Sequence, residues 1–172
     1  MAAEQTSEKI YIVDAENRPV AVMDAEQVHR QRLWHRGVLL ILLDRSGRLV
    51  LRRLGKNHPL HPSRWDLTGS GHVLWHEASE EAAWRYLPMA ARTAGPALFH
   101  RCTMHEGVGT GLEIVDVFHA HIPDPVAGTL ARDTDYLLVD QDELHALATS
   151  YADQLTPALL DVWRNSPDTL SS

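Results

Sequence analysis

The chain has 172 residues, of which 44% are hydrophobic and 23% are charged, and its formal net charge is −7. These proportions are typical of one globular domain and argue against a disordered or fibrous protein. Positive residues form no run, which argues against a nucleic-acid-binding surface, and the longest apolar run, Val38 to Leu43, is too short to cross a bilayer.

We therefore expect a single domain over residues 1–172, located in the cytoplasm, with flexible ends at 1–8 and 166–172 and with neither nucleic acid nor membrane as a partner. The polar start, Met1 to Glu8, has no hydrophobic region of the kind found in signal peptides. Cys102 is the only cysteine, which excludes a disulfide within the chain and a cysteine-based zinc site.

The first part of the chain predicts a hairpin, a short helix and a pair of strands. Lys9 to Asp14 and Pro19 to Asp24 are rich in Val and Ile and are separated by a turn. Ala25 to Leu33 has the composition of a helix. Val38 to Leu43 is typical of a central buried strand, and Arg48 to Arg53 predicts a strand paired with it.

Between these strands and the next helix, proline and glycine predict irregular backbone. Gly55 to Arg64 contains two His-Pro pairs and should be an exposed loop, after which Trp65 to Thr68 is extended. Ser79 to Leu87 predicts a helix with Ser79 as N-cap, and Ala90 to Thr93 continues helically beyond Pro88.

The remaining elements are a second hairpin, one strand and two closing helices. They are Ala97 to His105 and Leu112 to Ile122 around the glycine-rich Glu106 to Gly111, then Tyr136 to Val139, Asp142 to Thr149, and Pro157 to Trp163 with Thr156 as N-cap. This order of strands and helices predicts the α+β class, with a mixed central sheet flanked by helices.

Gly71, Glu77 and Arg85 have the spacing of the first half of the Nudix box, G-x5-E-x7-R-E-U-x-E-E. The chain thus resembles the Nudix (MutT-like) hydrolase superfamily. Its opening IYIVDAENRPV and the segments Leu33 to Arg36, Gly47 to Arg53 and Trp65 to His72 also look like isopentenyl-diphosphate isomerase and its bacterial Nudix relatives. The resemblance runs from Lys9 to Val139 and implies an α/β/α sandwich and diphosphate chemistry.

The second half of the box departs from the family pattern. Where the resemblance implies metal-binding glutamates, this chain has Tyr86, Met89 and Ala90, and Pro88 interrupts the segment. Because magnesium requires hard oxygen ligands, we expect the ordinary Nudix magnesium site to be absent or weak. Glu77, Glu81 and Arg85 are spaced to form an ion-paired ridge on one helix face, a structural alternative to a catalytic role.

The resemblance also implies a second set of metal ligands: His35, His72 and Glu113, with His29 able to join. Two imidazoles and a carboxylate suit zinc or manganese better than magnesium. The alternative is that His35 packs beside Trp34 and that His72 only hydrogen-bonds the loop.

Basic residues are the candidate diphosphate ligands. They are Arg52, Arg53, Lys56 and Arg64. Only one of Arg52 and Arg53 can face the site, because neighbouring strand residues point to opposite faces. A solvated, charged strand edge is the alternative interpretation.

Two functions follow from these residues. The first is a divergent Nudix hydrolase of a diphosphate-containing small molecule, with a divalent cation (Mg, Mn or Zn) and with Glu113, Glu77 and Glu81 as candidate catalytic carboxylates. The second is a catalytically silent module that binds a ligand or a protein. Isomerase chemistry is disfavoured, because Ser70 stands where the resemblance implies a cysteine acid. A homodimer is left open.

Overall fold

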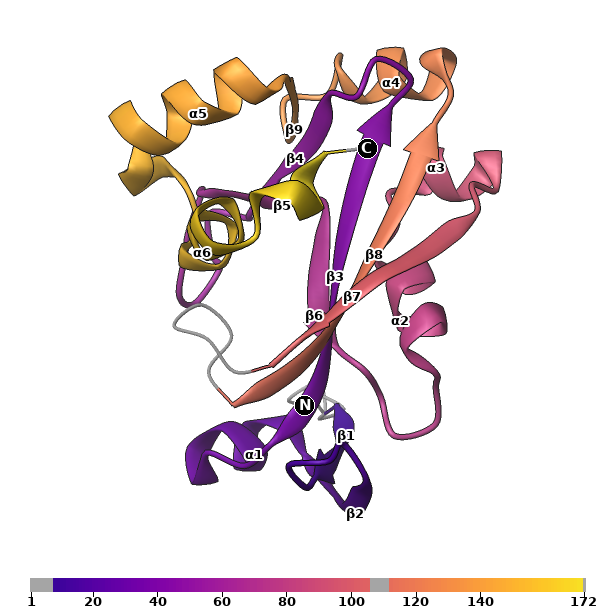
Figure 1. Ribbon diagram of the computed structural model, residues 1–172, viewed down its shortest axis with the longest axis vertical. Helices are drawn as coiled ribbons and strands as arrows, with labels where there is room; N and C mark the ends of the chain where they lie inside the picture. Colours follow the sequence, from indigo (N-terminus) through magenta and orange to yellow (C-terminus); the bar gives the residue numbers. More distant parts are fainter. Residues whose placement is uncertain (1–7, 106–111, 172) are drawn as a thin grey trace, which may run out of the picture.

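The computed structural model describes residues 8–105 and 112–171, which form a mixed sheet between two helical layers (Figure 1). The strands are β1 (Lys9–Val13), β2 (Pro19–Asp24), β3 (His35–Asp44), β4 (Leu49–Arg53), β5 (Trp65–Leu67), β6 (Gly69–His72), β7 (Leu98–Met104), β8 (Glu113–Ile122) and β9 (Tyr136–Val139). The helices are α1 (Ala25–Gln31), α2 (Ser79–Tyr86), α3 (Met89–Ala94), α4 (Asp124–Leu130), α5 (Gln141–Ser150) and α6 (Pro157–Asn165), with 3-10 turns η1 (Ala152–Gln154) and η2 (Pro167–Leu170).

Strand β3 is the centre of the sheet. It pairs antiparallel with β1, β4 and β6 and parallel with β8. The β3–β8 ladder is continuous from His35 opposite Glu113 to Asp44 opposite Ile122. Strand β4 meets β3 at one register position and pairs more extensively with β5 and β9. Both predicted hairpins, β1–β2 and β7–β8, are present.

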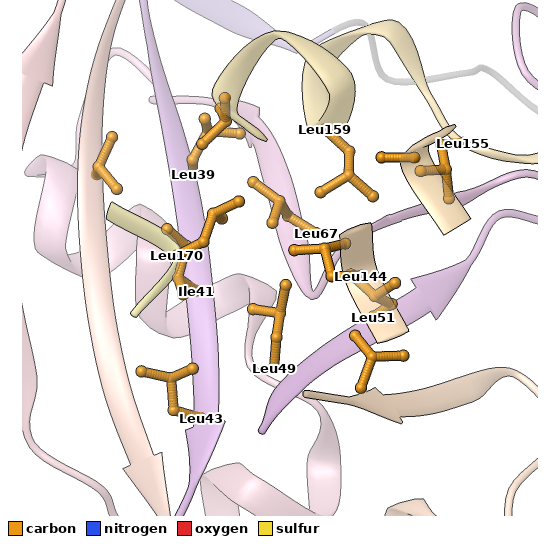
Figure 2. Packing of buried hydrophobic residues seen from close by; sticks show 14 of the residues in the cluster. Leu39, Ile41, Leu43, Leu49, Leu51, Leu67, Leu144, Leu155, Leu159 and Leu170 are labelled. Carbon is orange, nitrogen blue, oxygen red and sulfur yellow. The ribbon is translucent and has the colours of Figure 1, made fainter. Parts of the chain in front are cut away.

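The alternation of side chains along β3 builds both cores. Leu39, Ile41 and Leu43 point to a cluster that includes residues of α5, α6 and η2, as Figure 2 shows. Leu40 and Leu42 point the other way, into a cluster with α2, α3 and α4. A strand buried on both faces reads as an unbroken apolar run, and the predicted fold class is confirmed.

Several details differ from the sequence expectation. Helix α2 has Ala78, not Ser79, as its N-cap residue, because Ser79 already has helical geometry. The segment Gly69–His72 is a strand, and α4 was not predicted. Residues 166–172 were expected to be flexible; within them η2 places a fully buried Leu170 in the core.

The caps of two helices explain where these helices begin or end, and the predicted Thr156 cap is confirmed. The side chain of Thr156 accepts a hydrogen bond from the backbone N–H of Leu159 at the start of α6. Helix α3 ends at Gly95, whose positive φ of 64° suits glycine. Among the described helices, none is long and apolar enough to cross a membrane. The loop Glu106 to Gly111 lies outside the described residues.

Candidate metal and diphosphate site

Four side chains from four elements converge at one end of the sheet. They are His29 on α1, His35 on β3, His72 on β6 and Glu113 on β8, and one ligand atom of each lies within 4.8 Å of those of the others. The β-ladder explains the convergence, since His35 is directly opposite Glu113 in the parallel β3–β8 pair. On the other side of β3, Gly37 is opposite His72.

A glycine makes room for the carboxylate in this cluster. A Cβ atom added at Gly37 would lie 2.9 Å from Glu113 Oε2 and 3.4 Å from a methyl carbon of Val115. The first of these is closer than real Cβ contacts, so a side chain at position 37 would displace the carboxylate. We infer that Gly37 sets the position of Glu113.

Hydrogen bonds fix the orientation of two of the imidazoles. His35 Nδ1 donates to the carbonyl oxygen of Leu33 at 2.9 Å, and its Nε2 lies 3.2 Å from Glu113 Oε1. His72 Nδ1 lies 3.0 Å from a carboxylate oxygen of Glu8. In both rings Nε2 is directed toward the cluster, and His29 Nε2 is 2.8 Å from His72 Nε2.

The electrostatics of the cluster follow from burial and from Glu113. Burial opposes the charged form of His35, but the hydrogen bonds that His35 donates to Glu113 and to the carbonyl oxygen of Leu33 outweigh it and raise the pKa of His35. Burial, together with His35 and His72, lowers the pKa of His29. A lowered pKa favours the neutral ring, which is the form that binds a metal ion.

His29, His72 and Glu113 line a cavity of about 380 Å³ whose walls also include an arginine and a second carboxylate. Arg52 of β4 and Asp66 of β5 line it, together with Ser70 of β6 and Thr156 at the start of α6. The His58–His61 part of the loop forms another wall. Metal-ligating and phosphate-binding residue types thus share one hollow.

The predicted basic residues are distributed unequally around this hollow. Arg52 lines it, and the buried Arg52 Nε has no hydrogen-bond partner. Arg53 packs over the Trp65 ring, 5.6 Å from its centroid, and lines a neighbouring cavity of about 340 Å³. Arg64 donates to the carbonyl oxygen of Leu155. Lys56 is exposed and is not among the residues that line either cavity.

Glu77, in the turn before α2, and Glu81 of α2 both make structural contacts. Glu77 Oε1 accepts hydrogen bonds from Arg85 Nη2 at 2.6 Å and from the N–H of Leu74 at 2.9 Å, and Arg85 Nη2 also donates to the carbonyl oxygen of His72. This ion pair is partly buried, with 11% of the Glu77 side chain exposed. It ties the helix to the strand that carries His72.

Glu81 lies outside this ion pair. Its carboxylate accepts the backbone N–H of Ala78 at 2.7 Å, which satisfies an amide at the helix start. The predicted Glu77–Glu81–Arg85 ridge is therefore wrong in its middle member. Neither Glu77 nor Glu81 is among the residues that line the 380 Å³ cavity.

The segment that follows places an aromatic ring against the strand β6. Helix α2 ends at Tyr86, and α3 begins at Met89 after Pro88. A Cβ added at Gly69 would lie 2.6 Å from Tyr86 Cβ, and one added at Gly71 would collide with the Tyr86 hydroxyl. Both glycines are thus needed for the ring to pack here, and Met89 is largely exposed.

Some known proteins are similar to this chain in sequence. No protein-family model matches the chain. An isopentenyl-diphosphate Delta-isomerase of Burkholderia multivorans is 30% identical over 80 residues, which are 46% of this chain and 46% of that protein. An uncharacterized Nudix hydrolase of Yersinia pestis is 32% identical over 78 residues, 45% of this chain and 43% of that protein. The matched segments thus span less than half of each relative.

Solved structures agree over more of the chain. DR0079 from Deinococcus radiodurans has a TM-score of 0.70 at 17% identity, covering 91% of this chain and 98% of that chain. The NUDIX domain of Shewanella oneidensis NrtR, complexed with ADP ribose, has a TM-score of 0.53 at 15% identity, covering 87% and 100%. The chain has the Nudix fold. Together with the sequence relatives, this supports a place in the Nudix superfamily.

Some residues of this site were predicted from the sequence only in part or not at all. His29 was only an optional ligand, and it proves to touch His72. Asp66, His58 and His61 were not singled out at all. The Trp-Asp pair that opens the short strand after the His-Pro loop was a usable signal for Asp66, since a carboxylate beside an aromatic residue in a buried strand needs a partner or a function.

Proposed function

We propose that the chain is a divergent Nudix hydrolase that cleaves a diphosphate linkage in a small molecule, with a divalent cation held by His29, His35, His72 and Glu113. The observation that supports this most directly is the convergence of these four side chains, three of which line a cavity that Arg52 also lines. Arg52 supplies a planar guanidinium suited to phosphate oxygens.

The donor set fits such a cation. Donors about 2.1 Å from a common ion lie at most about 4.2 Å apart, so small side-chain movements would convert the 4.8 Å cluster into a coordination shell. The contacts of His35 with Leu33 and of His72 with Glu8 are of the outer-shell kind that orients metal-binding imidazoles. Three imidazoles and one carboxylate favour zinc or manganese over magnesium.

The residues then divide the chemistry of hydrolysis among them. A bound cation supplies neutralisation of the charge that develops on the phosphate oxygens. Arg52 binds and orients the diphosphate from another wall of the same cavity, and a carboxylate lining the cavity accepts the proton of the attacking water. Glu113 and Asp66 line the cavity, whereas Glu77 and Glu81 are held in the structural contacts of α2.

The loss of the ordinary Nudix carboxylate site belongs to the same proposal. Tyr86, Met89 and Ala90 offer no anionic oxygen, and the chain breaks from helix at Leu87 and Pro88 in the segment concerned. Metal binding is therefore moved to the histidine cluster. The same substitutions favour the second candidate, a module that binds a phosphorylated ligand without turnover.

The partner class follows from the cavity. A diphosphate-containing small molecule matches the proposed metal site and Arg52. The NUDIX domain of NrtR, which has a similar fold, was solved with ADP ribose. The chain's net charge of −7 favours such a ligand over nucleic acid. NrtR has also been solved with a 27mer DNA, so the absence of nucleic-acid binding stays a prediction for this chain.

The test combines metal stoichiometry with turnover. Metal-free protein is titrated with Mg²⁺, Mn²⁺ and Zn²⁺ by calorimetry and then incubated with a panel of diphosphate compounds, including ADP ribose, while the products are followed by ³¹P NMR. We expect one ion per chain, with manganese or zinc bound more tightly than magnesium, and cleavage that depends on the ion.

Two isosteric variants separate the hydrolase from the binding module. Glu113→Gln should lose both ion binding and cleavage, while Glu81→Gln, the same change outside the cavity, should keep both. Ligand binding without cleavage under every cation would establish the binding module instead. Ion binding that survives in Glu113→Gln would contradict the histidine-carboxylate site.

A further inference from the structure

Asp66 is a buried carboxylate that the proposed site has not yet used. It lies on β5, is 6% exposed, and lines the 380 Å³ cavity together with His72 and Glu113. Burying a carboxylate costs free energy unless hydrogen bonds or a charge partner compensate it. The two oxygens of Asp66 differ sharply in how far they are compensated.

One oxygen is fully engaged and the other is not. Asp66 Oδ1 accepts the N–H of Leu67 at 2.9 Å and the hydroxyl of Thr156 at 2.6 Å. Asp66 Oδ2 has only the hydroxyl of Ser70, at a long 3.4 Å. The two short bonds fix the rotation of the carboxylate, so Oδ2 is held in one orientation with capacity to accept a further proton.

The nearest basic residue in the sheet, Arg52, forms no ion pair with Asp66 Oδ2 among the described residues. Arg52 is directly opposite Asp66 in the β4–β5 ladder, and opposite residues of an antiparallel pair lie on the same face. Among the described residues, however, no ion pair joins them, and the buried Arg52 Nε is itself without a partner. The guanidinium of Arg52 and the carboxylate of Asp66 can thus each form further hydrogen bonds within the same cavity.

The other candidate bases are occupied. Glu113 is within hydrogen-bonding distance of His35 and would be a ligand of the metal ion. Glu77 accepts Arg85 and Glu81 caps α2. Among the described residues that line the cavity, Asp66 is therefore the carboxylate that remains available for proton transfer when Glu113 is a ligand of the cation.

We propose that Asp66 is the general base of the hydrolysis, an inference that rests on the function proposed above. A water molecule in the cavity transfers one proton to Asp66 Oδ2 while its oxygen forms a bond to phosphorus. The bridging P–O bond breaks, and its electron pair leaves with the departing phosphate, which is bound by Arg52. The proton then passes from Asp66 to solvent. Thr156 and Ser70 are positioning residues, because they orient the carboxylate.

The proposal is tested with Asp66→Asn at saturating metal, using the compound that the unmodified chain cleaves best. Asparagine keeps an oxygen to accept Leu67 N–H and Thr156, so the fold should be retained. We expect kcat to fall by about 100- to 10,000-fold, the contribution of a general base, with KM and the metal affinity nearly unchanged. In Asp66→Ala, added formate should restore part of kcat by entering the vacated space.

Asp44→Asn is the matched control, since Asp44 is equally buried but is hydrogen-bonded to Ser46 and Arg48 at the far end of β3. It should lower the unfolding midpoint and leave kcat unchanged. An Asp66→Asn variant that binds metal and retains kcat would overturn the assignment of the base while leaving the hydrolase intact. An unmodified chain that cleaves nothing under any cation would overturn the hydrolase and this inference together.

Discussion

The Glu77–Arg85 corner and the His29–His35–His72–Glu113 cluster both contact strand β6 at His72, and they use charged residues in different ways. In the corner, each charged group is matched by a partner on a neighbouring segment, and Arg85 also holds the carbonyl oxygen of His72. In the cluster, three ring nitrogens and a carboxylate face one another. An ion pair of the first kind braces the fold, whereas several metal-ligating atoms gathered beside a cavity are the arrangement expected of a ligand site.

The two halves of the Nudix box differ in what this chain has kept of them. Glu77 and Arg85 match the first half of the Nudix box, and the structure gives them a bracing role. The donor atoms of the cluster come from α1, β3, β6 and β8, segments far apart in the sequence. The first half of the box is thus retained in a structural role, whereas the proposed metal ligands come from residues outside the box.

The largest effect should follow removal of one cluster imidazole. His72→Ala removes a nitrogen that faces His29 and should weaken manganese or zinc binding by at least about 100-fold, because loss even of an outer-shell partner costs 10- to 100-fold. Calorimetric titration measures this. Glu8→Ala removes only the outer-shell contact of His72 and should weaken binding by about 10-fold. Equal, small losses in both variants would show that His72 is not a ligand.

Breaking the corner should instead lower stability. Glu77→Gln leaves the partly buried Arg85 charge without its carboxylate and should lower the free energy of unfolding by about 2 kcal/mol, less than for a fully buried pair because Arg85 is 34% exposed. Metal affinity should stay within about threefold. Urea unfolding and calorimetry are compared with Glu81→Gln, which weakens only the capping contact. A Glu77→Gln variant of unchanged stability but lost metal binding would reverse the two roles.

The framework of the fold was accessible from sequence because its signals are local. The apolar run of β3 predicts a strand buried on both faces, and Thr156 followed by Pro157 predicts the start of α6. Strand β6 was missed because Gly-Ser-Gly has little strand propensity and is held by backbone pairing with β3. Helix α4 was missed because Pro125 and Gly128 in a short segment are typical of loops.

The site was accessible only in part, because its geometry depends on pairing between distant strands. The family resemblance supplied His35, His72 and Glu113 as candidates, but only the parallel register of β3 and β8 brings His35 opposite Glu113. The orientation of the Asp66 carboxylate depends on a contact with Thr156, 90 residues later in the chain. Such long-range contacts leave no periodicity in the sequence.

A smaller change tests how finely the sheet positions the cluster. Gly37→Ala adds a methyl group that would approach Glu113 Oε2 to 2.9 Å, so the carboxylate must shift by a few tenths of an ångström. We expect metal affinity to fall by about 10-fold, or about 1.4 kcal/mol, with the unfolding midpoint little changed. Calorimetry of the folded variant measures both quantities. Unaltered affinity would mean that Glu113 reaches the ion from another rotamer, and that Gly37 is not part of the positioning.

The smallest expected effect concerns the ring that joins the two regions. Burial raises the pKa of the Tyr86 hydroxyl, which stays neutral and accepts a hydrogen bond from Arg85 Nη1 at 3.2 Å. Tyr86→Phe keeps the ring packed against Gly69 and Gly71 and removes only this bond, so unfolding should become easier by about 1 kcal/mol or less. Metal affinity should not change, because Tyr86 supplies no donor to the cluster. A large loss of metal binding in Tyr86→Phe would show that the corner and the cluster are energetically coupled through this hydroxyl.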